Sequence, residues 1–154
     1  MKQIAVVGLC AYLQLSDGRV LGLDLDKKIL APVAALENVQ VTAICSDNAQ
    51  TRLFVGTQLS EVVSYDAELN IMHFDQLDLG PIFSLAYCTA HDDLTILGST
   101  GRLATLSYAQ ECFVMRVNMN AIATSVVVSE SGAIAAACEL DYVLVQYRSS
   151  AKTH

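Results

Sequence analysis

The chain has 154 residues, of which 53% are hydrophobic and 16% are charged, and its net charge at pH 7 is −7. This composition is too apolar for a disordered chain and predicts one domain in which many strands are buried on both faces. Nine scattered Lys and Arg residues against sixteen acidic ones argue against electrostatic binding to nucleic acid. No apolar run approaches the roughly 20 residues of a membrane-spanning helix, so no membrane partner is expected.

The N-terminal segment 1–10 pairs a lysine with a short apolar run, as a signal peptide does. The run is short, Leu9 stands before Cys10 where a lipoprotein signal needs a small residue, and the pattern alternates like a strand from Tyr12 onward. We therefore expect no targeting segment and a cytoplasmic or nuclear location.

Four segments align along the chain with a period of about forty residues, and three of them show the same internal pattern. Each of these three contains three runs of four to seven apolar or β-branched residues, separated by turn signals. The runs begin at Val41, Arg52 and Glu61, then at Ile82, Leu94 and Arg102, then at Ile122, Ala133 and Asp141. Equivalent positions Val62, Leu103 and Val143 are 41 and then 40 residues apart. Such a period is typical of blades, solenoid units or arrays.

The four segments, of which the first is less regular, predict an all-β fold of four antiparallel meander units, near residues 10–36, 41–77, 82–118 and 121–147. The first strand of each unit is apolar throughout, which favours a central position covered on both faces. The fourth, such as 70–75, is more polar and favours an exposed outer edge. Lys28–Leu36 contains three alanines and fits a helix, but we favour an outer strand with Pro32 at its edge.

The second strand of a unit ends with a small residue before a tight turn, Gly56 or Gly98. The inner-strand residues Ile44, Leu85 and Val127 occupy matching positions and are expected to be buried where neighbouring units pack. The tyrosines that recur with the repeat are expected to pack between units with their hydroxyl groups at an edge; they are Tyr65, Tyr108 and Tyr147.

Residue pairs at the end of each third strand carry a family resemblance. They are Leu23-Asp24, Tyr65-Asp66, Tyr108-Ala109 and Tyr147-Arg148, with first residues 42, 43 and 39 apart. The turns 17–21 and 100–104, before the third strand, have a similar pattern. In these features the chain resembles the WD40-like β-propeller repeats, whose third strand ends in Trp-Asp. It has no Trp and no Gly-His pair, so the Asp–His–Ser–Trp network associated with that family is missing and the resemblance is to a divergent member.

The resemblance implies about four β-propeller blades, which form either a closed small ring or half of a larger propeller. It covers a single domain at residues 1–148, followed by a polar tail at 149–154. The last unit supplies three strands, and Ile4–Val7 looks like a spare strand before Tyr12–Leu15. We expect this spare strand either to close on Tyr142–Tyr147 within the chain or to leave an edge that a partner completes.

Histidine, the usual acid–base residue, is scarce. His154 is terminal, and His73 alternates with apolar residues on a presumed outer strand, which favours a solvated or edge position. His91-Asp92-Asp93 has the residue types of a cation site, but an ordinary polar turn explains it at least as well. We therefore expect no metal ligands.

The two glycine patterns are weak. Ile4–Gly8 looks like the first strand of a dinucleotide-binding unit, but the glycine fingerprint fails after it. Gly98–Gly101 lacks the lysine of a phosphate loop and fits a hairpin turn. No cofactor and no catalytic residue are expected.

The five cysteines are expected to be reduced and structural. None has the spacing of a zinc or redox motif, and the odd count fits a disulfide scaffold poorly. Cys45 and Cys88 fall at nearly equivalent positions on inner strands. The others are Cys10, Cys112 and Cys138.

These features predict a non-catalytic protein–protein interaction scaffold, a subunit of a larger complex with protein partners at an exposed blade edge. The alternative is a small ligand-binding or enzymatic β domain with a loop-lined cleft. A fold resemblance carries function only by analogy.

Overall fold

The computed structural model describes residues 2–118, 123–129, 134–138 and 143–146. In these residues the chain forms fifteen strands and two short 3₁₀ helices, arranged as four antiparallel sheets. The expected all-β meander fold is confirmed. No helix in this part of the chain has the length and apolar character needed to cross a membrane.

Each sheet is a meander in which consecutive strands pair. The first sheet contains β1 (Gln3–Val7), β2 (Cys10–Gln14), β3 (Val20–Asp24) and β4 (Ile29–Pro32). The second contains β5 (Val41–Ser46), β6 (Leu53–Thr57), β7 (Glu61–Tyr65) and β8 (Ile71–Gln76). The third contains β9 (Ile82–Cys88), β10 (Asp93–Gly98), β11 (Arg102–Ser107) and β12 (Cys112–Asn118). The fourth contains β13 (Ala123–Val128), β14 (Ile134–Cys138) and β15 (Val143–Gln146).

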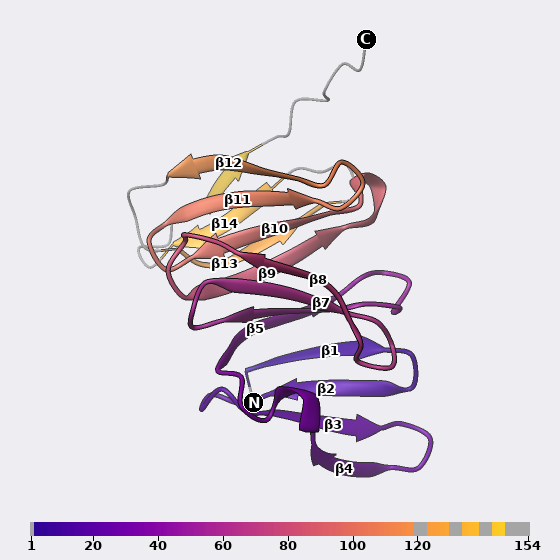
Figure 1. The fold of residues 1–154 in the computed structure, drawn as a ribbon. Coiled ribbons are helices and arrows are strands. Elements are labelled where there is room, and N and C mark those ends of the chain that lie inside the picture. Colours follow the sequence, from indigo (N-terminus) through magenta and orange to yellow (C-terminus); the bar gives the residue numbers. More distant parts are fainter. Residues whose placement is uncertain (1, 119–122, 130–133, 139–142, 147–154) are drawn as a thin grey trace.

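The four sheets form a series in which the first strand of each packs on the first strand of the next. These contacts are β1 on β5, β5 on β9, and β9 on β13. Figure 1 shows the first sheet at one end of this series and the third and fourth sheets at the other. The apolar first strands therefore have the central role that their composition predicts.

The expectation that Ile4–Val7 is a spare strand is wrong. These residues belong to β1, the first strand of the first sheet, which pairs with β2 from Gln3↔Gln14 to Val7↔Cys10. Gly8 and Leu9 alone connect the two strands, and two residues suffice for a hairpin turn. The first unit therefore begins at Gln3 rather than near residue 10.

Closure of β1 on the fourth sheet within the chain is not seen either. Among the described strands, β15 pairs with β14 only. Tyr142, Tyr147, His154 and the tail 149–154 lie outside the described residues.

The outer strands are exposed, as expected. Residues 29–32 of β4 and 71–74 of β8 are all exposed. Pro32 lies in β4, at the edge of the first sheet, so Lys28–Leu36 contains the favoured outer strand. The 3₁₀ helix η1 (Ala34–Leu36) follows it and buries Leu36.

Three apolar clusters lie between successive sheets. The first cluster joins sheets one and two and contains Ala5, Val7, Tyr12, Ile44, Val55, Val63 and Tyr65 among others. The second joins sheets two and three and contains Phe54, Val62, Ile82, Leu85, Ile96 and Ala104, with Cys45 and Tyr108 packed against it. The third joins sheets three and four around Leu97, Leu103 and Val126, with Ala86 packed against it. The expected packing of Tyr65 and Tyr108 between units is confirmed.

Two glycines allow consecutive sheets to approach closely. A Cβ atom on Gly56 would lie 2.5 Å from Cγ2 of Ile82, and one on Gly98 would lie 2.1 Å from the carbonyl oxygen of Leu79. The small residue near the end of β6 and of β10 thus makes room for the chain that leads into the third sheet.

The burial expected for the inner strands is correct for two of the three residues. Ile44 and Leu85 are 3% and 5% exposed, but Val127 is 63% exposed. The cross-strand pairs Ile44↔Val55, Leu85↔Ile96 and Val126↔Ala136 make Val126 the true equivalent, and it is 4% exposed. An error of one residue in strand register moves a side chain to the opposite face, which explains the wrong assignment.

Candidate functional site

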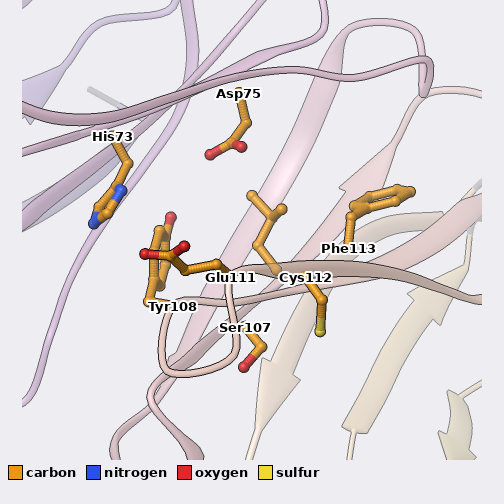
Figure 2. Close-up of a pocket in the computed structure, with 8 residues that line it drawn as sticks. His73, Asp75, Ser107, Tyr108, Glu111, Cys112 and Phe113 are labelled. Carbon is orange, nitrogen blue, oxygen red and sulfur yellow. The ribbon is translucent and has the colours of Figure 1, made fainter.

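A pocket of about 360 Å³ lies between the outer strand β8 and the β11–β12 hairpin. Figure 2 shows His73 and Asp75 entering it from β8, and Tyr108 and Glu111 entering it from the hairpin. His73 and Asp75 are two residues apart on a strand, so both project from the same face. Pairing of β11 with β12 brings the hairpin side chains opposite them.

Two carboxylates line this pocket. Asp75 and Glu111 contribute carboxylates, and the His73 ring packs on the ring of Tyr108 with their centroids 5.1 Å apart. Burial, with the nearby Asp75 carboxylate, raises the pKa of Tyr108, so its hydroxyl stays protonated and can donate a hydrogen bond. The pocket is therefore suited to a positively charged group.

The pocket also contains Ser107 and Cys112, residue types that can act as nucleophiles. Ser107 Oγ accepts a hydrogen bond from the backbone N–H of Gln110 at 3.2 Å, and Cys112 Sγ donates to Gln110 Oε1 at 3.7 Å. Figure 2 shows both side chains directed away from His73. The pocket thus does not pair a nucleophile with a base, which acyl-transfer chemistry requires.

A cluster around Arg52 joins the second and third sheets close to this pocket. The guanidinium donates hydrogen bonds to Asp92 Oδ1 at 2.9 Å and to the hydroxyl of Tyr87, and it lies 3.6 Å from Asp47. Its central carbon also lies 4.9 Å from the centroid of the Tyr87 ring, within cation–π range. The Arg52 side chain is 18% exposed, so its role is to hold the two sheets together rather than to bind a ligand.

The carboxylates and hydroxyl of this cluster are held in fixed protonation states. Burial would raise the pKa of Asp47, but hydrogen bonds from Thr51 and Arg52 outweigh burial and keep that pKa below its usual value. Burial and the hydrogen bond to Asp92 raise the pKa of Tyr87 to about 12. Asp47 is therefore ionised and Tyr87 protonated across the physiological range.

The His91-Asp92-Asp93 turn does not gather its side chains around one point. His91 is exposed in η2 (Thr89–His91), Asp92 pairs with Arg52, and Asp93 begins β10 and is buried. Among the described residues, no three His, Cys, Asp or Glu side chains are arranged to hold a metal ion. The turn is structural, and His73 lies on β8 as expected.

The described cysteine side chains are free thiols: Cys10, Cys45, Cys88 and Cys112. Cys88 is buried, and burial raises the pKa of the Cys45 thiol. A raised pKa lowers the thiolate fraction and makes a cysteine unreactive. The side chain of Cys138 lies outside the described set.

The aspartates of the Leu23-Asp24 and Tyr65-Asp66 pairs close the turns that follow them. Asp24 Oδ1 accepts backbone N–H groups of Asp26 and Lys27, and Asp66 Oδ1 accepts that of Asn70 at 2.8 Å. These hydrogen bonds hold the pKa of both aspartates below the usual range. The third sheet has Ala109 at the matching position, and Ser107 closes its turn instead.

Beyond the pocket, the outer strand β8 itself exposes apolar side chains. Ile71, Met72 and Phe74 are 62%, 47% and 55% exposed, and β8 is the last strand of its sheet. Phe113 of β12, on the rim of the pocket, is also exposed. An edge strand with apolar side chains and unpaired backbone groups is a template for pairing with another chain.

A second apolar surface covers the face of the first sheet that points away from the second sheet. We call it the first-sheet end face, and by cross-strand pairing it contains Ile4, Val6, Ala11, Leu13, Leu21, Leu23, Leu30 and Pro32. No charged residue belongs to it. Side chains alternate between the two faces along each strand. The residues of the end face therefore lie on the other side of the sheet from Ala5, Val7 and Tyr12, which pack on the second sheet.

Sequence analysis did not identify the Arg52 cluster or the first-sheet end face. Arg52 and Asp92 are 40 residues apart, and each looks like an ordinary turn residue. The end face did leave a signal in the sequence. The segments 4–7, 11–13 and 20–23 contain only apolar residues and glycine on both alternating faces, like the strands of internal sheets.

Comparison with known proteins finds similarity in structure only. No described protein family and no curated protein match the sequence. The WD40 β-propeller domain of Doa1 matches with a TM-score of 0.80 at 12% identity, over 97% of this chain and 51% of that chain. A chain of the Mitotic Checkpoint Complex matches with a TM-score of 0.77 at 14% identity, over 96% of this chain and 48% of that chain.

The computationally designed Ika4 protein also matches, with a TM-score of 0.78 at 12% identity, over 96% of this chain and 91% of that chain. At these identities the likeness establishes the fold: the chain is a WD40-like β-propeller structure with about four blades, each blade being one of the sheets described above. The chain spans about half the length of the Doa1 and checkpoint-complex chains that it matches.

Proposed function

We propose that this chain is a non-catalytic protein-interaction scaffold, a subunit of a larger assembly that binds an extended segment of a partner along β8. The observation that carries the proposal is the edge strand itself, with its exposed Ile71, Met72 and Phe74. Backbone hydrogen bonds to an edge strand supply affinity, and pockets for alternate side chains supply specificity.

The pocket beside β8 defines the chemistry of that partner segment. Phe74 pairs with Val63 and lies on the opposite face of the sheet from His73 and Asp75. A strand added along β8 has one face beside Phe74 and the other beside the carboxylates of Asp75 and Glu111. The preferred segment is therefore extended, with apolar residues on one face and a Lys or Arg on the other.

The sequence features that support this proposal also favour a reducing compartment, the cytoplasm or the nucleus. The described thiols are unpaired, and that of Cys45 is kept protonated by burial. The net charge of −7 favours basic protein segments over nucleic acid.

Selection of a random peptide library on the immobilised chain tests this function. We expect enrichment of peptides that alternate apolar residues with Lys or Arg. Phe74→Asp should abolish the enrichment, and Asp75→Asn combined with Glu111→Gln should remove only the preference for basic residues. The control is Ser16→Asp, at an exposed residue in the turn between β2 and β3 of the first sheet. Absence of enrichment, or enrichment that survives both sets of substitutions, contradicts the proposal.

A second candidate is a small-ligand site in the same pocket, favoured by its volume of about 360 Å³ and its acidic groups. Small cationic compounds screened by ligand-observed NMR distinguish the two functions. Binding that requires Asp75 and Glu111 but not Phe74 favours the ligand site, whereas peptide binding that requires Phe74 favours the scaffold.

A further inference from the structure

The first-sheet end face is the counterpart of faces that are buried elsewhere in this chain. Its central row is Ile4, Leu13 and Leu21. The equivalent rows, from cross-strand pairing, are Ile44, Val55 and Val63 in the second sheet and Leu85, Ile96 and Ala104 in the third. Those residues are at most 5% exposed because the preceding sheet covers them, whereas Ile4 is 53% exposed.

In the interior of the chain, each of these rows is covered by one small residue from the first strand of the preceding sheet. The covering residues are Ala5 of β1, Cys45 of β5 and Ala86 of β9. Each lies in the same apolar cluster as the first-strand residue of the next sheet that it covers. The corresponding pairs are Ala5 with Ile44, Cys45 with Leu85, and Ala86 with Val126. The covering side chain is small and uncharged each time, as close packing of two sheets requires.

The fourth sheet presents the next covering residue, and nothing in the described residues packs on it. Val127 follows Cys45 and Ala86 at intervals of 41 residues and is 63% exposed. Val127 and Ile4 are therefore the exposed residues at the two ends of one repeated packing pattern.

A polar contact occurs in the same register at two of these three interfaces. The backbone N–H of Ile44 donates to Gln3 Oε1 at 2.9 Å, and that of Val126 donates to Ser84 Oγ at 3.1 Å. In each case the acceptor lies two residues before the covering residue. Ser125, exposed and two residues before Val127, offers the same hydroxyl at the end of the series.

We propose that two copies of this chain join end to end, with the first-sheet end face of each packed on the Ser125 and Val127 face of the other. Ile4 then packs beside Val127 of the second copy, and Ser125 Oγ accepts the backbone N–H of Ile4. The proposed pair makes this end-to-end contact twice and closes into one ring of eight sheets. A contact whose rotation did not close after two copies would give an open series instead.

Three observations select a second copy as the occupant. The chain carries both halves of the packing pattern, one at each end. The residues that define the first-sheet end face, and Ser125 and Val127 on the described part of the other, carry no charged side chain, so contact between them desolvates no ion. The chain also matches about half of each of two WD40 propeller-containing chains, so two copies supply about the length of one. This inference is independent of the proposed function, because β8 belongs to neither end face.

The solution mass of the purified chain tests the proposal. Light scattering after size-exclusion chromatography should give twice the chain mass of 16.6 kDa. Ile4→Lys and Val127→Glu should each reduce it to a single chain mass. An equimolar mixture of the two variants should restore the double mass, because one of its two contacts pairs Lys with Glu and the other is unchanged. The matched control, Phe74→Lys, changes an equally exposed apolar residue outside both faces and should keep the double mass.

A photo-crosslinking residue at position 4 provides a second measurement that does not depend on charged variants. The expected adduct contains two chains joined between position 4 and residues 123–129. A single chain mass for the unsubstituted protein, an open series of larger species, or an adduct to any other segment or protein overturns the proposal. Loss of peptide binding along β8 would leave these results unchanged, so the two proposals fail separately.

Discussion

Arg52, directly before β6 of the second sheet, donates a hydrogen bond of 2.9 Å to the carboxylate of Asp92 in the turn before β10 of the third sheet. Tyr87 donates to the same carboxylate oxygen at 2.6 Å, so a cation and a hydroxyl converge on one acceptor. The contact couples two sheets whose remaining packing is largely an apolar cluster. It is a charge-assisted pair in partly buried surroundings, where such hydrogen bonds are strongest.

Replacing Arg52 should therefore destabilise the fold. Arg52→Met leaves Asp92 and Tyr87 without the guanidinium, and we expect the free energy of unfolding to fall by roughly 1–3 kcal/mol. Arg52→Lys should recover only part of this free energy, because an ammonium group lacks the planar arrangement of donors of a guanidinium. Urea denaturation measures both effects. Arg19→Met is the matched control, since the Arg19–Asp17 pair is 71% and 52% exposed and should contribute less than about 0.5 kcal/mol. Equal losses for Arg52 and Arg19 would contradict this role.

The Asp47 carboxylate should make stability depend on acid pH. Its pKa in the folded chain lies below the ordinary 3.8, so the unfolded chain binds the proton more readily. The stabilisation is complete above that ordinary value and is lost as the pH falls below it, through the folded pKa. Urea midpoints between about pH 6 and about pH 2 should decline less steeply for Asp47→Asn than for the unsubstituted chain. Parallel declines would show that Asp47 is not responsible.

The loss of stability on replacing a glycine between sheets with alanine should depend on which atom the new Cβ contacts. Gly98→Ala places a Cβ 2.1 Å from a backbone carbonyl, and Gly56→Ala places one 2.5 Å from a methyl group of Ile82. Crowding of this kind costs about 1–3 kcal/mol, and the backbone contact should cost more because it cannot rotate away. Gly22→Ala, 3.2 Å from a methyl group of Val33, should cost least. Thermal unfolding of the three variants checks the order, and an inverted order would mean that the sheets separate more easily than their packing indicates.

The sheets could be predicted well from the sequence because the signals that define them come from residues close together in the chain. Hairpins join neighbouring strands, and the register of Val62, Leu103 and Val143 agrees with the cross-strand pairs Gly56↔Val62, Leu97↔Leu103 and Ala137↔Val143. The pattern identifies the strand at Ile4–Val7 but makes it look like a spare one, because the two-residue turn at Gly8 and Leu9 leaves no polar stretch that marks a hairpin with β2.

Ile44, Leu85 and Val126 are 41 residues apart, so Val127 is one residue out of the repeat, and a shift of one residue exchanges the two faces of a strand. Other features depend on three-dimensional detail that one sequence does not carry. The pocket and the Arg52 cluster combine residues from different sheets. Their partners are set by how the sheets pack, which a lone turn residue does not reveal.

The neighbouring residues Val126 and Val127 give a direct test of that register. Val126→Ala removes two buried methyl groups and should lower the free energy of unfolding by about 1–3 kcal/mol. Val127→Ala should leave unfolding of the single chain within about 0.5 kcal/mol and act on pairing of copies instead. Denaturation in the Ile4→Lys background, where the copies are separated, isolates the first effect. A larger loss for Val127 than for Val126 would restore the original register and remove the basis for the end-to-end contact.

The central claim is that the two ends of this propeller-like series cover each other in a second copy, while β8 stays open. Hydroxyl-radical footprinting of the purified chain compares two isoleucines of similar exposure in the single chain, Ile4 at 53% and Ile71 at 62%. The account predicts slow oxidation of Ile4, rapid oxidation of Ile71, and recovery of Ile4 oxidation in Val127→Glu. Equal oxidation of Ile4 and Ile71 in the unsubstituted chain would contradict it.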